Sequence, residues 1–96
     1  MPEPTYIVDL GAHEGETVTI RGWLYNKRSS GKIAFMQLRD GTGMVQAVAT
    51  PQDVDETSWN LIGDVTQESS IIVTGSVRAD ARSPTGFELG VELVEI

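Results

Sequence analysis

Phe35 is the side chain in this sequence that is best suited to bind another molecule. It lies in the run KIAFMQLR, where a strand would turn alternate residues toward a core and leave Phe35 on the opposite face beside Gln37. The core-facing residues of this run are Ala34, Met36 and Leu38. An aromatic ring among polar neighbours has two interpretations. It packs against the end of a fold, or it is a platform on which a nucleobase stacks, which contributes roughly 1–3 kcal/mol.

Positive charge is concentrated around Phe35. The segment 17–39 holds five of the seven Lys and Arg residues and no Asp or Glu, although the net charge of the chain is −7. These five cations are Arg21, Lys27, Arg28, Lys32 and Arg39. Because Lys and Arg drive binding to phosphates by displacing counterions, a basic stripe on an acidic body predicts a nucleic-acid partner. A chance grouping of solvated surface charges is the alternative.

Few residues support catalysis or metal binding. The chain has one histidine, His13, and no cysteine, and no spacing pairs a nucleophile with a base, so an independent enzyme is not expected. Asp53, Asp55 and Glu56 are grouped, but acids at a helix start are explained by the helix dipole, and we expect no metal site. The Gly-Thr-Gly segment 41–43 is too short for a phosphate-binding loop.

Length and composition predict one small soluble domain. A chain of 96 residues can form a single core, and without cysteine it has neither a disulfide framework nor a thiolate metal site. No apolar run approaches the roughly 20 residues of a membrane-spanning helix, and the N-terminus lacks a basic leader with an apolar run. We therefore expect a cytoplasmic protein without a membrane partner.

Alternating apolar residues predict five strands. The first runs from Val18 to about residue 25, and the others cover 32–39, 44–49, 71–79 and a segment that begins at Phe87. Small and polar residues predict turns at 28–31, 40–43 and 81–86. The inward residues expected in the last two strands are Ile71, Val73, Gly75, Val77 and Ala79, then Phe87, Leu89, Val91 and Leu93.

One helix is expected between the third and fourth strands. Thr50 as the cap, Pro51 in the first turn and Asp53 three residues after the cap predict a helix over about 52–65. Gly63 weakens it by up to about 1 kcal/mol relative to alanine. Three strands, one helix and two strands is the order of the OB-fold, an all-β, five-stranded Greek-key barrel with its helix between strands three and four.

Three segments resemble a known family. They are GWLYNKRSSGKIAFMQLRDGTGMVQAVA, VTQESSIIVTGSV and FEL, within residues 15–96. Together they resemble the N-terminal anticodon-binding domain of asparaginyl-tRNA synthetase, in the class II group that also contains the aspartyl and lysyl enzymes. The GW, LRDG and VQ elements are shared across that group, whereas NKRSSGKIAF is similar to the asparaginyl members.

The resemblance implies roles for particular residues. In the family, the sheet face of the first three strands binds the anticodon, and three positions read its middle uridine; the matching residues here are Phe35, Gln46 and Glu88. Phe35 would stack on the uracil, while Gln46 and Glu88 would hydrogen-bond its polar edge. The matching arginine, Arg28, would contact the anticodon backbone or a neighbouring base. Candidate phosphate contacts, or simply solubilising charges, are Lys27, Lys32 and Arg39.

The resemblance also sets what this chain is expected to lack. Family members continue into a larger catalytic domain that binds ATP and magnesium and joins the amino acid to tRNA, and they are homodimers. Residues 1–96 correspond only to the anticodon-binding domain, so we expect a non-catalytic module that binds the asparagine tRNA anticodon loop and contains no cofactor. A stand-alone OB domain that binds single-stranded nucleic acid in general, or another protein, is the alternative.

Overall fold

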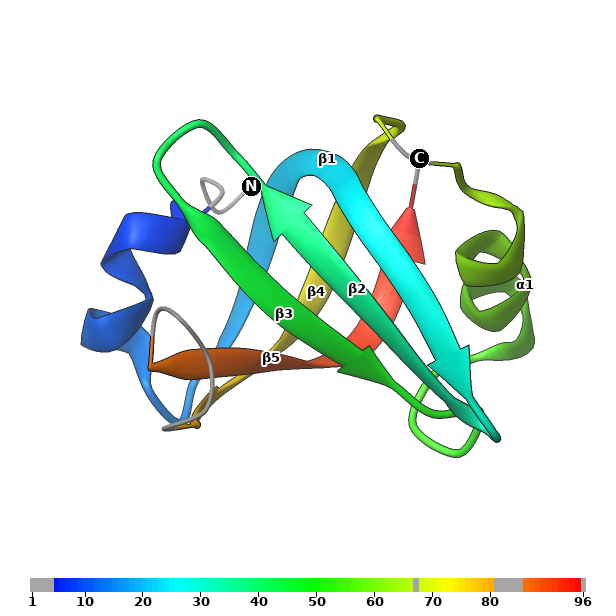
Figure 1. Cartoon of the computed structure of the whole chain (residues 1–96). Coiled ribbons are helices and arrows are strands. Elements are labelled where there is room, and N and C mark those ends of the chain that lie inside the picture. Colours follow the sequence, from blue (N-terminus) through cyan, green and yellow to red (C-terminus); the bar gives the residue numbers. More distant parts are fainter. Residues whose placement is uncertain (1–4, 67, 81–85, 96) are drawn as a thin grey trace.

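The computed structural model describes residues 5–66, 68–80 and 86–95. A 3-10 helix, η1 (Ile7–His13), precedes the strands β1 (Thr17–Ser30), β2 (Ile33–Arg39) and β3 (Met44–Ala49). Helix α1 (Glu56–Asp64) leads to β4 (Ser70–Ala79) and β5 (Phe87–Glu95). The strands close into a barrel in the order β1-β2-β3-β5-β4, as Figure 1 shows. The predicted OB-fold is therefore confirmed, with its helix between β3 and β4.

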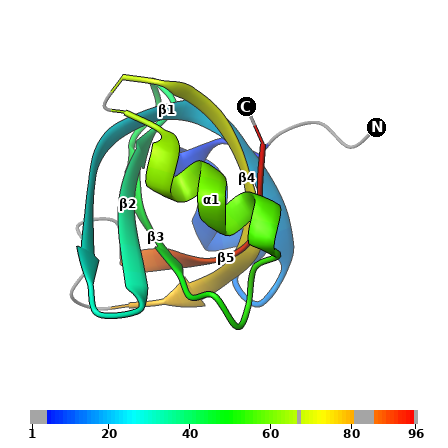
Figure 2. The ribbon, with the colours of Figure 1, turned by 90° about the vertical axis from the view of Figure 1, so that its right-hand side faces the viewer.

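The two helical segments lie at opposite ends of the barrel (Figures 1 and 2). Ile7 and Leu10 of η1 are buried, and so are Ser58 and Ile62 of α1. The buried Ser58 hydroxyl accepts a hydrogen bond of 2.9 Å from the backbone amide of Val94, so its burial leaves no unpaired polar atom. None of the helices among the described residues is long and apolar enough to cross a membrane.

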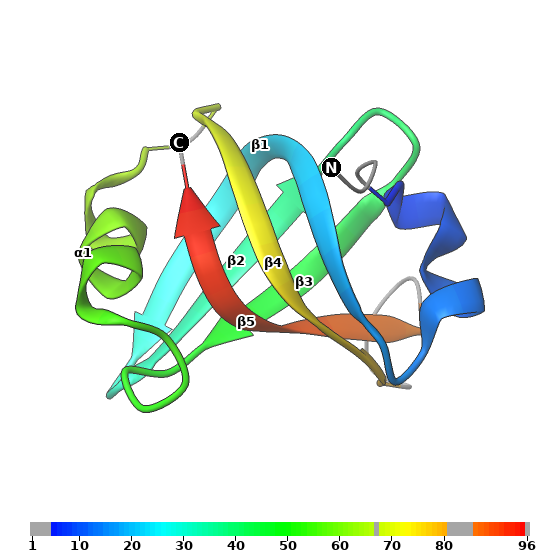
Figure 3. The same cartoon turned by 180° about the vertical axis from the view of Figure 1, so that it is seen from behind.

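Strand β1 is long enough to pair with two neighbouring strands. Its first half pairs with β4 and its second half with β2, and it curves between them (Figure 3). Gly22 lies where the strand changes partner, and a side chain there would overlap the carbonyl oxygen of Arg39. The close approach of two backbones at this point therefore requires glycine.

A bulge at Tyr25 reverses the alternation of β1. Leu24 pairs with Leu38 and Asn26 with Gln37, so Tyr25 is one extra residue on this strand. Up to Leu24, the even-numbered residues face the core. Beyond the bulge, the even-numbered residues lie on the outer face.

A second bulge makes one prediction for β5 wrong. Gly75 pairs with Val91 and Thr74 with Leu93, so β5 also carries an extra residue. Leu93 is therefore 39% exposed, and Val94 occupies the buried position instead. A one-residue shift moves each following side chain to the other face of a strand.

The helix begins later than predicted. Residues 50–54 form a turn, in which Thr50 Oγ1 donates to Asp53 Oδ2 at 2.9 Å and the amide of Val54 donates to the Thr50 carbonyl at 3.2 Å. Helix α1 starts at Glu56, with Asp55 as its N-cap. A Thr followed three residues later by an acid also stabilises an isolated turn, and here the turn forms.

The turn between β1 and β2 is shorter than predicted. Strand β1 continues to Ser30, which pairs with Ile33, so the turn consists of Gly31 and Lys32. Gly31 has a φ of +61°, which glycine adopts without strain.

Ala79, predicted to face inward, is exposed at the last position of β4. Residues 81–85 of the predicted turn before β5 lie outside the described residues.

Candidate nucleic-acid interface

The outer face of the barrel carries two rows of side chains that run across the strands. Residues that pair directly across strands have Cβ atoms about 5 Å apart, so each row is a set of close neighbours. The polar row consists of Asn26, Gln37, Gln46, Glu88 and Arg78, in strand order β1, β2, β3, β5 and β4. The aromatic row consists of Arg28, Phe35, Val48, Gly90 and Ser76.

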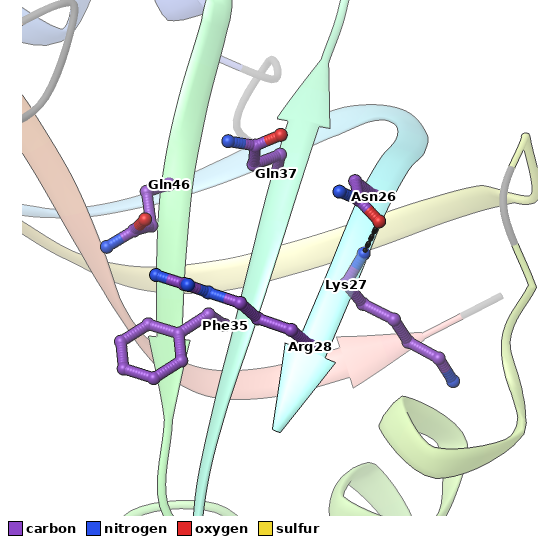
Figure 4. Close-up of a pocket in the computed structure, with 6 residues that line it drawn as sticks. All are labelled: Asn26, Lys27, Arg28, Phe35, Gln37 and Gln46. Carbon is purple, nitrogen blue, oxygen red and sulfur yellow. Dashed lines mark hydrogen bonds between the residues drawn. The ribbon is translucent and has the colours of Figure 1, made fainter. Parts of the chain in front are cut away.

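A cavity of about 290 Å³ lies where the two rows meet on β1, β2 and β3. Figure 4 shows its lining, with the amide groups of the polar row on one side and the Phe35 ring on the other. The residues that line it are Asn26, Lys27, Arg28, Phe35, Gln37 and Gln46. A nucleobase has a flat apolar face and a polar edge. The Phe35 ring can stack against the face, and the amide groups can hydrogen-bond with the edge.

Phe35 lies on the outer face and is half-buried. The guanidinium carbon of Arg28 lies 5.1 Å from the centre of the Phe35 ring, a cation–π geometry. Arg28 reaches this position because the bulge at Tyr25 turns it outward, opposite Phe35. The outward position of the ring is what the stacking interpretation requires, and Arg28 adds a positive charge next to it.

Glu88 lies between two polar partners. It is the direct cross-strand neighbour of Gln46 on β3 and of Arg78 on β4. Its Oε1 accepts from Arg78 Nη2 at 2.9 Å, and its side chain is 19% exposed against 51% for Arg78. The fold therefore brings Gln46 and Glu88 side by side, with Gln46 one strand and Glu88 two strands away from Phe35. Gln46 lines the cavity, whereas Glu88 lies beside it.

The other candidate cations are spread over different parts of the barrel. Lys27 Nζ donates to the carbonyl oxygens of Ile62 and Gly63 at the C-terminal end of α1, both at 2.9 Å. Figure 4 shows this side chain extending away from Phe35. Lys32 is exposed in the turn between β1 and β2, and Arg39 lies four residues beyond Phe35 on β2. The basic segment of the sequence is thus not one continuous stripe around the cavity.

The two remaining cations of segment 17–39, Arg39 and Arg21, do not line the cavity. The guanidinium of Arg39 lies 5.8 Å from the centre of the Tyr25 ring, which is also outward. Arg21 is exposed on β1 and pairs with Ile72 of β4, in the half of β1 that does not border the cavity. Of the cations predicted to bind RNA, Arg28 is the one that contacts the Phe35 ring.

Three residues of the polar row were not assigned a role from the sequence. Gln37 could have been found, because the alternation of β2 already places it on the face of Phe35. Asn26 could not have been found, because the alternation of β1, continued without the bulge, turns Asn26 inward. Arg78 belongs to β4, and the pairing of β4 with β5 is what places it beside Glu88.

The acids near α1 have a structural explanation. Asp55 accepts a hydrogen bond of 3.2 Å from the Ser58 amide, and the hydrogen bonds from the Ser58 side chain and backbone lower the pKa of Asp55. An ionised N-cap is what a helix start favours. In the part of the chain that the structure describes, no three His, Asp or Glu residues are grouped closely enough to hold a metal ion.

Sequence comparison places this chain among nucleic-acid-binding domains. Residues 18–96 match the family described as the OB-fold nucleic acid binding domain. The chain is similar to an asparagine–tRNA ligase of Koribacter versatilis, with 49% identity over 94% of this chain and 20% of the relative. It is also similar to one of Pelotomaculum thermopropionicum, with 50% identity over 98% of this chain and 22% of the relative. The chain thus spans about a fifth of the length of these relatives.

Two solved structures that superpose on this chain are also described as tRNA synthetases. The asparaginyl-tRNA synthetase of Pyrococcus horikoshii, complexed with asparaginyl-adenylate, superposes with a TM-score of 0.91 and 38% identity, over all of this chain and 22% of that one. A putative aspartyl-tRNA synthetase from Leishmania major Friedlin superposes with a TM-score of 0.81 and 30% identity, over 99% of this chain and 21% of that one. Because the superpositions cover 99–100% of this chain, the strands that carry the outer face are among the parts that are shared.

Proposed function

The chain belongs to the family of OB-fold nucleic acid binding domains, as an anticodon-binding domain of the asparaginyl-tRNA synthetase type, and we propose that its cavity reads the middle uridine of the anticodon. The observation that carries this proposal is the position of the Phe35 ring. The ring is outward, lies under Arg28, and borders a cavity that also contains Gln46. In this proposal uracil stacks on Phe35 with its polar edge toward Gln46 and Glu88.

The polar partners suit uracil better than cytosine. An ionised carboxylate only accepts hydrogen bonds, whereas an amide both donates and accepts. Uracil offers a ring N–H to Glu88 and a carbonyl oxygen to the amide of Gln46. Cytosine presents a ring nitrogen that accepts at the position of that N–H, so it would face the carboxylate with two acceptors opposed. A mismatch of this kind leaves buried polar groups unpaired and lowers affinity.

The wider role of the chain follows as part of the same proposal. We expect the asparagine tRNA anticodon loop to be the partner, because the relatives in the comparison include asparagine–tRNA ligases. Joining the amino acid to tRNA, with ATP and magnesium, would be carried out by the parts of such ligases that this chain does not match. A cytoplasmic location and assembly into a homodimer are expected for the whole ligase on the same grounds.

Titration with anticodon stem-loops tests the proposal. The chain should bind a loop with a central uridine more tightly than the same loop with a central cytidine. Phe35→Leu keeps the apolar volume but removes the aromatic face, and it should weaken binding to the uridine loop by about 1–3 kcal/mol. The melting temperature should change little, because Phe35 lies outside the core.

Ile33→Ala is the matched control. Ile33 lies on the same face of β2, two residues from Phe35, and is 38% exposed. It should leave the affinity for both loops unchanged. Equal affinity of the wild-type chain for the two loops and for an unrelated loop would contradict the proposal and would favour a general single-strand binder. A Phe35→Leu chain that unfolds would instead identify Phe35 as a packing residue.

A further inference from the structure

We propose that Arg78 is a positioning residue that fixes the Glu88 carboxylate beside Gln46, and that Gly90 is required because the Arg78 guanidinium lies across it. This inference rests on the proposed function, since it concerns how the base-reading carboxylate is held. In the barrel, Glu88 lies on β5 between Gln46 of β3 and Arg78 of β4. One neighbour of Glu88 borders the cavity, and the other lies outside it.

The ion pair holds the less exposed partner. Arg78 Nη2 donates to Glu88 Oε1 at 2.9 Å, and the Glu88 side chain is 19% exposed while that of Arg78 is 51% exposed. The partner that is held is therefore the carboxylate, while half of the Arg78 side chain remains in contact with solvent. A partly exposed ion pair adds little to the stability of a fold. Its effect here is on the position of Glu88.

Gly90 provides the space for this contact. A Cβ atom at Gly90 would lie 3.1 Å from Arg78 Cζ and 3.2 Å from both Arg78 Nη2 and Ser76 Oγ. The Arg78 guanidinium thus lies over the bare backbone of Gly90. Gly90 is not among the residues with positive φ, so the requirement is for space rather than for an unusual backbone conformation. An added Cβ would therefore require the guanidinium to shift by a few tenths of an ångström.

A fixed, ionised Glu88 matters for the choice of base more than for affinity in general. The carboxylate can accept the ring N–H of uracil, and it opposes the ring nitrogen of cytosine only if it stays charged and in place. Without Arg78, the carboxylate loses the contact that orients it beside Gln46. Loss of Arg78 or of the space at Gly90 should therefore reduce the preference for uridine.

The test compares the affinity ratio for uridine-centred and cytidine-centred loops. Arg78→Ala and Gly90→Ala should each lower this ratio by roughly threefold to tenfold, the effect of losing one well-placed hydrogen bond. Glu88→Gln should lower it at least as much. In the Glu88→Gln background, Arg78→Ala should cause no further loss, because Arg78 acts through Glu88. Gly63→Ala, where no atom lies within 4 Å of the added carbon, is the control and should leave the ratio unchanged.

Other outcomes would overturn the inference. If Arg78 binds an RNA phosphate itself, Arg78→Ala should weaken both loops equally and reduce the slope of log affinity against log salt by about 0.7. A Gly90→Ala chain that keeps its uridine preference would show that the guanidinium does not need this space. If Gly90→Ala unfolds, the double variant with Arg78→Ala relieves the contact and should fold, and its ratio should equal that of Arg78→Ala.

The two proposals fail in different ways. A wild-type chain without uridine preference would remove the base-reading function itself. A wild-type chain whose preference depends on Glu88 but survives Arg78→Ala would keep that function and remove only the positioning role.

Discussion

The two turns at the ends of β2 use their polar residues differently. At the β2–β3 turn, Asp40 accepts hydrogen bonds from the Ile7 amide at 2.7 Å and from the Thr42 amide and hydroxyl at 2.8 and 2.6 Å. The Thr42 hydroxyl accepts in turn from the Val8 amide at 3.1 Å. At the β1–β2 turn, Lys32 is exposed, and nearby Arg28 lies over an outward aromatic ring.

This difference separates a structural end of β2 from a binding end. The polar groups of the β2–β3 turn are satisfied within the chain and attach η1 to the barrel, so they are not available to a partner. The cations near the β1–β2 turn face outward, with one exception: Lys27 is bound to the end of α1. Adjacent cations in the sequence thus take different roles, because Lys27 binds within the chain while Arg28 lies over an outward ring.

Asp40→Asn should give the largest change at the structural end. The amide nitrogen cannot accept a hydrogen bond, so part of the set that joins η1 to the β2–β3 turn is lost. We expect the free energy of unfolding to fall by about 1–3 kcal/mol, while affinity for the anticodon loop stays the same. Urea denaturation and loop titration measure the two quantities. Asp9→Asn, on the exposed side of η1, is the control, and an equal loss there would show that Asp40 has no special role.

The pH dependence of stability should report the same contact. Burial alone would raise the pKa of Asp40, but hydrogen bonds from Thr42, Ile7 and Gly43 outweigh it and hold this pKa below its ordinary value of 3.8. The stabilising effect of the ionised carboxylate is therefore complete above about pH 4 and is lost as the pH falls through the lowered pKa. The difference in stability between wild type and Asp40→Asn should shrink on acidification below pH 4. A difference that is constant down to pH 2 would contradict this assignment.

Lys27→Met and Arg28→Met should give the smallest changes. The first should affect the stability of the fold, and the second the salt dependence of RNA binding. Lys27→Met removes a cation from the end of α1 and should cost about 0.3–1 kcal/mol of stability, without altering the salt dependence of RNA binding. Arg28→Met should leave stability nearly unchanged but reduce the log–log salt slope, expected to be roughly −2 to −4 in the wild type, by about 0.7. A reduced slope for Lys27→Met would show that this lysine leaves the helix and binds phosphate.

Local patterns in the sequence were enough to predict the fold and to suggest the chemistry of the candidate site. Alternation of apolar residues identified all five strands and the inward residues of β2, because burial of one sheet face imposes a period of two. The order of strands and helix identified the OB-fold. The types of Phe35, Gln46 and Glu88, read through the family resemblance, suggested a base-reading site. These features depend on local pattern, which a sequence carries directly.

Which side chains meet depends on the tertiary structure. The bulge at Tyr25 turns Arg28 outward over Phe35 and sends Lys27 to α1, although the two residues are adjacent in the sequence and both are positive. The pairing of β4 with β5 brings Arg78 to Glu88, ten residues later in the chain. Bulges and strand pairings are set by how the whole barrel closes, so no local pattern of residues reveals them.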